Sequence, residues 1–93
     1  MSIAATQSEA DILSRIIAPE KPTLPSQTAE MILAFDFPAR DRDRMELLAE
    51  NARTGMLTVE EQVEVDAYER VGPFLSLLKS KARISLKQSR RTE

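Results

Sequence analysis

The chain has 93 residues, of which 42% are hydrophobic and only 4% are aromatic. This length suits one small domain with an aliphatic core, and two glycines and five prolines are too few turn formers for a many-stranded sheet. The absence of cysteine and histidine excludes disulfides, the usual zinc sites and the usual general base. The net charge of −2 conceals a division, because residues 1–78 carry fourteen acids against seven bases, whereas residues 79–93 carry six bases against one acid.

The first predicted helix covers about residues 10–17. Ser8, followed three residues later by Asp11, has the pattern of a capping box, and Pro19 ends the helix. Four apolar residues recur at helical spacing and form one face: Ile12, Leu13, Ile16 and Ile17. Because so short a helix is marginal alone in water, we expect it to dock. We favour docking on its own domain over insertion into a partner.

Residues 18–25 contain three prolines and are therefore expected to be extended, as a connector or a strap across a surface. PxxP patterns occur here, but such patterns are common by chance. Ser26 is expected to cap a second short helix that runs to about Ala34. Its inward residues are Ala29, Ile32 and Leu33. The Phe35–Pro38 segment then forms a corner in which we expect both phenylalanine rings to be buried.

The third predicted helix covers residues 38–54 and ends at Gly55, where a left-handed residue is needed. Its inner face is predicted to consist of Met45, Leu48, Ala49 and Ala52. Its outer face is predicted to consist of Arg40, Asp41, Arg42, Asp43, Arg44, Glu46 and Glu50. The acids on that face suggest a metal site, but interleaved arginines favour a solvated, salt-bridged surface. The glycine and distal glutamate of a calcium loop are also missing.

The longest predicted helix covers residues 59–88 and opens with a capping box from Thr58 to Glu61. Its apolar residues keep steps of three or four: Val65, Tyr68, Val71, Leu75, Leu78, Ala82 and Leu86, widened by Phe74, Leu77 and Ile84. Pro73 either kinks this helix or splits it after Gly72. We favour a kink, since the apolar phase continues across it.

We therefore expect an all-α fold in one domain. Two short N-terminal helices pack on an antiparallel pair, which is joined through residues 55–57 and ends in the long kinked helix. Residues 1–7 and 89–93 are expected to be flexible ends. No apolar run reaches the roughly 20 residues of a membrane span, and residues 1–13 lack the pattern of a signal peptide. We therefore expect a cytoplasmic protein.

Several segments resemble a family of short, mostly uncharacterised bacterial helical proteins. These segments are residues 55–61 (GMLTVEE), 68–71 (YERV) and 77–86 (LLKSKARISL), with weaker similarity over residues 15–20 and 33–38. The family pattern has a GTLTPEE cap that opens a helix ending in LLQSKAR-SL. Members are often encoded beside small nucleases, including HNH-type nucleases, which implies an antitoxin-like or regulatory role. The chain departs from the family at Pro73 and at residues 24–26, and the first departure puts a straight long helix in doubt.

Three classes of function follow from these patterns. The first is a non-catalytic antitoxin-like or immunity-like protein that binds another protein, such as a nuclease, or itself. The candidate contacts are Tyr68, Phe74, Leu75, Leu77 and Ile84. The alternative is a nucleic-acid-binding accessory protein, with contacts from Lys79, Lys81, Arg83, Lys87, Arg90 and Arg91, which spread around the helix. An enzyme is disfavoured, because no phosphate loop or nucleophile elbow is present, and we expect no cofactor.

Overall fold

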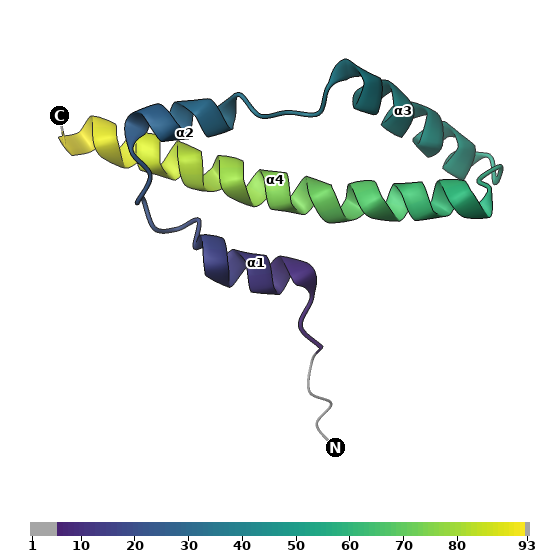
Figure 1. Ribbon diagram of the computed structural model, residues 1–93, viewed down its shortest axis with the longest axis horizontal. Coiled ribbons are helices and arrows are strands. Elements are labelled where there is room, and N and C mark those ends of the chain that lie inside the picture. The colour runs from purple at the N-terminus through teal and green to yellow at the C-terminus, as the bar shows by residue number, and fades with distance from the viewer. Residues whose placement is uncertain (1–5, 93) are drawn as a thin grey trace.

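The computed structural model describes residues 6–92, and this part of the chain contains helices and no strand (Figure 1). The helices are α1 (Glu9–Ile17), α2 (Ser26–Leu33), α3 (Ala39–Arg53) and α4 (Val59–Thr92). The prediction of an all-helical chain that ends in a long helix is confirmed. The helix was predicted to end at Gln88, but α4 continues to Thr92. Of the predicted flexible ends, residues 1–5 and 93 lie outside the described residues.

Local sequence signals set most of the helix ends. The Ser8 hydroxyl accepts from the Asp11 N–H and the Asp11 carboxylate accepts from the Ser8 N–H, both at 3.1 Å. Thr58 and Glu61 form the same reciprocal pair at 3.0 Å before α4. Gly55 follows α3 with φ of 71°, a left-handed conformation that glycine adopts without a Cβ clash. These caps were predictable because each depends on residues three or four positions apart.

The start of α2 differs from the prediction. Ser26 is the first residue of the helix, and the N-cap is Pro25, which makes no side-chain hydrogen bond. The Ser26 hydroxyl instead shares a 2.8 Å hydrogen bond with the hydroxyl of Ser89 on α4. The predicted cap is therefore wrong, since a partner distant in sequence takes the hydroxyl.

The three shorter helices all pack on α4, and within residues 6–92 no two of them pack on each other. Figure 1 shows α1 on one side of α4 and shows α2 and α3 in succession along the other. The molecule measures 53 × 47 × 16 Å, and its radius of gyration is 17.2 Å, against about 12 Å for a compact domain of this length. It is one helix thick and has two open faces, whereas most domains stack two layers.

The buried apolar residues of the described chain are few and all lie on or against α4: Ile17, Ala29, Leu48 and Ala82. Residues 18–25, which we call the strap, cross α4 between α1 and α2 (Figure 1). The Leu24 N–H donates to the hydroxyl of buried Ser85 at 3.2 Å. The Lys81 ammonium donates to the carbonyl of Ile17. Polar contacts thus fix the strap on the C-terminal half of α4.

Several side chains predicted to lie inside are exposed. Phe35 is 52% exposed, so the prediction that both corner rings are buried is wrong. Phe37 is half-buried and meets Tyr68 edge to face, with the ring centroids 6.0 Å apart. Ile12 and Ile16 of α1 are exposed, as are the α3 residues Ala49 and Ala52. The reason is the single layer, in which each short helix has one neighbour and therefore buries only a narrow strip.

Within the described residues, none of the helices has the length and apolar content that a membrane crossing requires.

Candidate protein-binding surface

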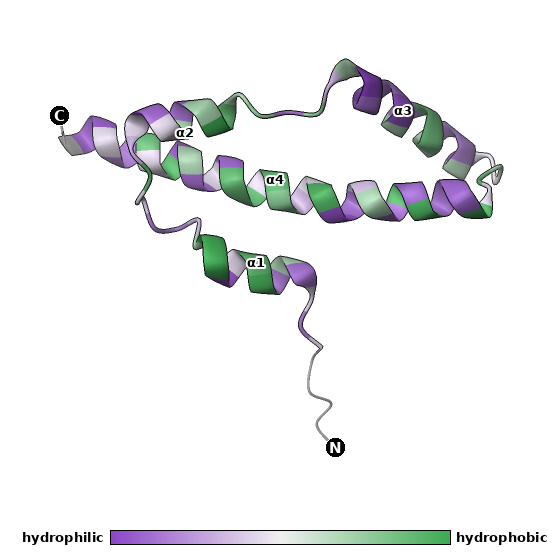
Figure 2. Ribbon diagram, in the orientation of Figure 1, coloured by the Kyte–Doolittle hydropathy of each residue, from purple (hydrophilic) through white to green (hydrophobic). Residues whose placement is uncertain are grey.

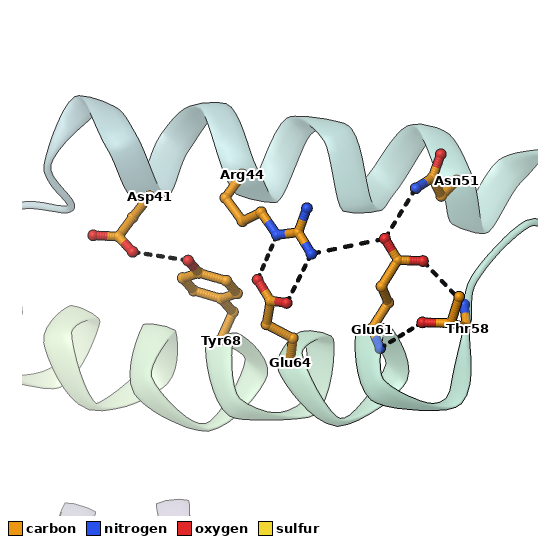
Figure 3. A network of polar contacts seen from close by, with 7 residues as sticks. All are labelled: Asp41, Arg44, Asn51, Thr58, Glu61, Glu64 and Tyr68. Carbon is orange, nitrogen blue, oxygen red and sulfur yellow. Dashed lines mark hydrogen bonds and ion pairs between the residues drawn. The ribbon is translucent and has the colours of Figure 1, made fainter.

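A network of polar side chains links α3 to α4 (Figure 3). Arg44 donates to Glu64 through Nε at 2.6 Å and through a terminal nitrogen at 2.9 Å. The same guanidinium lies 3.7 Å from the carboxylate of Glu61. Asn51 donates to Glu61 at 3.3 Å. The Glu61 carboxylate therefore serves both the cap at Thr58 and the contact with α3.

The Arg44–Glu64 pair perturbs both partners. The Glu64 hydrogen bonds raise the pKa of the Arg44 guanidinium, and the same bonds hold the pKa of the Glu64 carboxyl below its usual value. The sequence-based prediction placed Arg44 on the outer face of α3, and that placement is wrong. A charged residue in an alternating run of arginines and aspartates carries no local signal of which neighbour it faces.

Tyr68 forms the next contact along α4. Its hydroxyl donates to Asp41 at 2.8 Å. This hydrogen bond, together with burial, raises the pKa of the phenol above its usual value. Tyr68 therefore has an intramolecular role in joining α3 to α4, although it was predicted as a contact for a partner protein.

The N-terminal half of α4 carries an uncovered apolar stripe. It consists of Val59, Val63, Ala67, Val71 and Phe74, all exposed. Steps of four, four, four and three residues place them on one face of the helix. Figure 2 shows hydrophobic segments along this half of α4 and a mainly hydrophilic C-terminal end. In the C-terminal half the end of α1 and the strap cover this side, since Lys81 contacts Ile17 and Ser85 contacts Leu24. Val63, by contrast, is 61% exposed.

The apolar stripe opens into an apolar groove of about 530 Å³ between α4 and the α2–α3 linker, which we call the linker groove. Its walls are Ala34, Phe35, Asp36, Phe37, Pro38, Val71, Phe74, Leu75 and Leu78. Val71 and Phe74 belong to both features, so the stripe and the groove form one continuous surface. Contiguous exposed apolar area of this kind marks an interaction site more often than scattered single residues do.

Acidic residues border this surface. Between Val59 and Phe74 the sequence has five acids and a single base, Arg70. Glu61 and Glu64 are engaged by Arg44. Among the residues that the structure describes, no ion pair or side-chain hydrogen bond engages the exposed Glu60 and Glu69. Glu60 lies on the same side of α4 as the stripe, three residues before Val63, and gives the apolar surface free negative charge at its N-terminal end. Glu69 lies on the opposite side of α4, in the groove that faces α3.

The structure brings together only part of the predicted protein-contact set. Phe74 and Leu75 line the linker groove. Leu77 and Ile84 are half-buried and lie outside that groove, and Tyr68 is engaged with α3. Sequence reasoning missed Val59, Val63 and Phe35 as surface residues. The four-residue spacing of the two valines was visible, but a sequence does not show which part of an apolar face the other helices leave uncovered.

The six predicted nucleic-acid contacts separate into two groups. Lys81 points toward the end of α1, where it donates to the Ile17 carbonyl. The other five lie on the other side of the helix by their spacing; of these, Lys79 is half-buried, and the exposed residues are Arg83, Lys87, Arg90 and Arg91.

The chain matches no family model, no curated protein and no solved structure. Within residues 6–92, no group of three or more acidic side chains is arranged to hold a metal ion. The apolar stripe and the linker groove are therefore interpreted from their own chemistry.

Proposed function

We propose that this chain is a cytoplasmic, non-catalytic binding protein whose apolar stripe and linker groove receive a basic amphipathic helix of another protein. The observation that carries the proposal is the continuous uncovered surface from Val59 to Leu78 on a molecule 16 Å thick. A helix that lies along the stripe from Val59 to Phe74 covers about 22 Å, or roughly four turns. Helix-in-groove recognition of this kind uses apolar anchors at steps of three and four residues.

The charge beside the stripe favours a basic helix over a second copy of this chain as the bound partner. The exposed Glu60 lies beside the stripe without an intramolecular partner in the described chain, so a helix with a lysine or arginine on its flank gains a complementary contact. A second copy of this chain brings the same acidic half against itself, and the resulting like-charge contacts disfavour self-association through the stripe.

A nuclease fits this description of a partner. Proteins that act on nucleic acids carry basic surfaces that neutralise phosphates, and an acidic protein associates rapidly with such a surface. The resemblance to small bacterial proteins encoded beside nucleases points the same way. We therefore propose an antitoxin-like or immunity-like role, in which the acidic body covers a basic region of its partner.

Two features of α4 are part of the same proposal. Successive α3 residues 41, 44 and 51 contact α4 residues 68, 64 and 61 in reverse order, which supports an antiparallel pairing of the two helices. Pro73 lies inside α4, lacks an N–H for the Glu69 carbonyl and crowds it with its ring. We propose that this bends α4 beside Phe74 and helps to widen the linker groove.

The first experiment uses a synthetic 18-residue amphipathic peptide of leucine and lysine as the probe and a leucine–glutamate peptide as its control. Titration calorimetry at 150 mM salt is expected to show binding of the basic peptide only. Val63→Lys is expected to weaken this binding at least tenfold, because it puts a like charge in the stripe. Met31→Lys is the matched control, since Met31 is also exposed, at 63%, but lies on α2.

Equal binding of both peptides would overturn the proposal, because the surface would then lack charge selectivity. Equal losses of peptide affinity in Val63→Lys and Met31→Lys would also overturn it, because the binding surface would then not include the stripe. Light scattering of the chain alone is expected to give a monomer of 10.5 kDa. A stable dimer that Val63→Lys dissociates would show that a second copy occupies the surface. The resemblance implies a nuclease as the physiological partner, and inhibition of such a nuclease by the wild-type chain, with activity restored by Val63→Lys, is the expected result.

A further inference from the structure

The last 14 residues of α4, from Lys79 to Thr92, carry five cations on one side. Lys79, Arg83, Lys87 and Arg90 follow one another at steps of four, four and three residues, and Arg91 is four residues after Lys87. These steps keep all five within one half of the helix circumference. We call them the basic face. Lys81, which donates to the carbonyl of Ile17 at the end of α1, is the reason that the sequence alone made the cations look dispersed.

No acid neutralises the basic face within α4, because none occurs between Arg70 and Thr92. The strap and α2, which pack on this half of α4, bring Glu20 and Glu30. Neither of these forms an ion pair with a described residue. The nearest acid upstream on α4, Glu69, lies about 15 Å from Lys79 along the helix. That separation exceeds the Debye length of about 8 Å at physiological salt.

Two ordinary explanations do not account for this arrangement. Cations stabilise the negative end of a helix dipole only within about its last turn, and Arg83 lies more than two turns before Thr92. A solvated surface helix usually interleaves both signs of charge, as α3 does with Arg40, Asp41 and Arg42. The basic face has one sign only.

We propose that the basic face binds the phosphodiester backbone of nucleic acid without reading its sequence. From Lys79 to Arg91 the helix rises about 18 Å, with a mean spacing of about 4.5 Å between successive cations, so several phosphates along one strand are contacted together. No aromatic residue follows Phe74 in the sequence, so base stacking is absent and single strands gain no preference. This goes beyond the proposed partner binding, because the apolar stripe lies on the other half and another side of α4.

The experiment measures fluorescence anisotropy of a labelled 20-base-pair duplex of mixed sequence with the full chain at 50 to 200 mM salt. Each phosphate neutralised contributes about −0.9 to the slope of log K against log salt. Five contacts predict a slope of about −4.5, which is about a 500-fold loss of affinity across this range. A second duplex of unrelated sequence is expected to bind equally.

The test variant replaces three exposed cations of the basic face with glutamine, a good helix former: Arg83→Gln, Lys87→Gln and Arg90→Gln. It is expected to reduce the slope by about 2.7. A charge-matched control replaces three exposed arginines of α3: Arg40→Gln, Arg42→Gln and Arg53→Gln. The control is expected to leave the slope unchanged. Circular dichroism verifies that both variants fold, and Arg83→Lys with Arg90→Lys is expected to retain binding.

Three results would overturn the proposal: a slope near zero for the wild type, equal effects of the two triple variants, or displacement of DNA by an equal charge concentration of polyglutamate. The last result would assign the basic face to an acidic protein. Binding of the leucine–lysine peptide to the basic-face triple variant separates this proposal from the proposed function. That binding is expected to persist whether or not DNA binding is lost.

Discussion

Leu48→Ala tests whether α3 packs on α4 as described. Leu48 is 2% exposed and is the largest fully buried side chain of the described chain. Replacing a buried leucine with alanine costs about 2–5 kcal/mol of unfolding free energy, depending on how well the space collapses. Here the leucine also lines an open groove of about 360 Å³, with Met45, Ala49, Ala52 and Val65. Neighbouring side chains and water therefore have access to the vacated space. The expected loss of unfolding free energy is therefore in the lower part of that range, about 2–3 kcal/mol.

Urea unfolding followed by circular dichroism measures this loss. A chain of this length has a total stability of about 5–14 kcal/mol, and its thin single layer places it toward the lower end. With an m-value near 1 kcal/mol per molar for a small protein, the midpoint is expected to fall by about 2–3 M. Leu47→Ala is the control, because Leu47 is the next residue on the same helix and is 49% exposed. It is expected to lose less than about 1 kcal/mol.

Equal losses from Leu47→Ala and Leu48→Ala would refute the reasoning. That result would mean that α3 does not turn Leu48 toward α4 in solution. A loss from Leu48→Ala below about 1 kcal/mol, with Leu47→Ala near zero, would mean that α3 adds little to the folding of the rest of the chain.

Three further predictions follow from other contacts. Arg44→Met is expected to reduce the stability that the protein loses on acidification. Glu64 has a lowered pKa in the folded state, so it stabilises the fold above its unfolded pKa and loses that contribution as pH falls through its folded pKa. Urea midpoints at pH 6 and pH 3 measure this loss, and an equal loss in wild type and variant would contradict the prediction. Ala18 has φ of 49°, a left-handed conformation that strains a residue with a Cβ, so Ala18→Gly is expected to raise stability by up to about 1 kcal/mol. Gly55 has φ of 71°, so Gly55→Ala is expected to lower stability by about 1 kcal/mol. Opposite shifts in melting temperature are expected, and shifts of the same sign would refute the strain argument. Leu78→Ala is expected to cost about 1–2 kcal/mol, less than a fully buried leucine, because Leu78 is half-buried in the wall of the linker groove; a loss above about 3 kcal/mol by urea unfolding would place it in a closed core.

The parts of the fold that the sequence predicted well are those fixed by near neighbours. The Ser8–Asp11 and Thr58–Glu61 capping boxes and the left-handed Gly55 each depend on a few adjacent residues, and the structure contains all three. Ser26 failed because its hydroxyl meets Ser89, sixty-three positions away. The local sequence pattern shows that a hydroxyl lies near the start of a helix, but it does not show that folding brings a second hydroxyl, that of Ser89, within hydrogen-bonding distance.

The candidate surface was less predictable for a related reason. The apolar phase of α4 includes Val71 and Leu78 on one continuous face, and the sequence does not show where that face stops being covered. Whether the face is covered depends on the strap, whose Leu24 contacts Ser85, and on the α2–α3 linker, whose Phe35 stays 52% exposed at the wall of the linker groove. The basic face was obscured in the same way until the contact of Lys81 with Ile17 separated it from the other cations.

The dependence of all three shorter helices on α4 has a consequence for cooperativity. Since α1, α2 and α3 share no contacts with one another in the described chain, substitutions on α1 and on α3 have no common neighbour except α4, and their costs are expected to add within about 0.5 kcal/mol. Amide exchange in α1 can then proceed by local opening while α3 stays protected. Change accumulates independently in the three short helices, whereas each stretch of α4 is constrained by the short helix that packs on it.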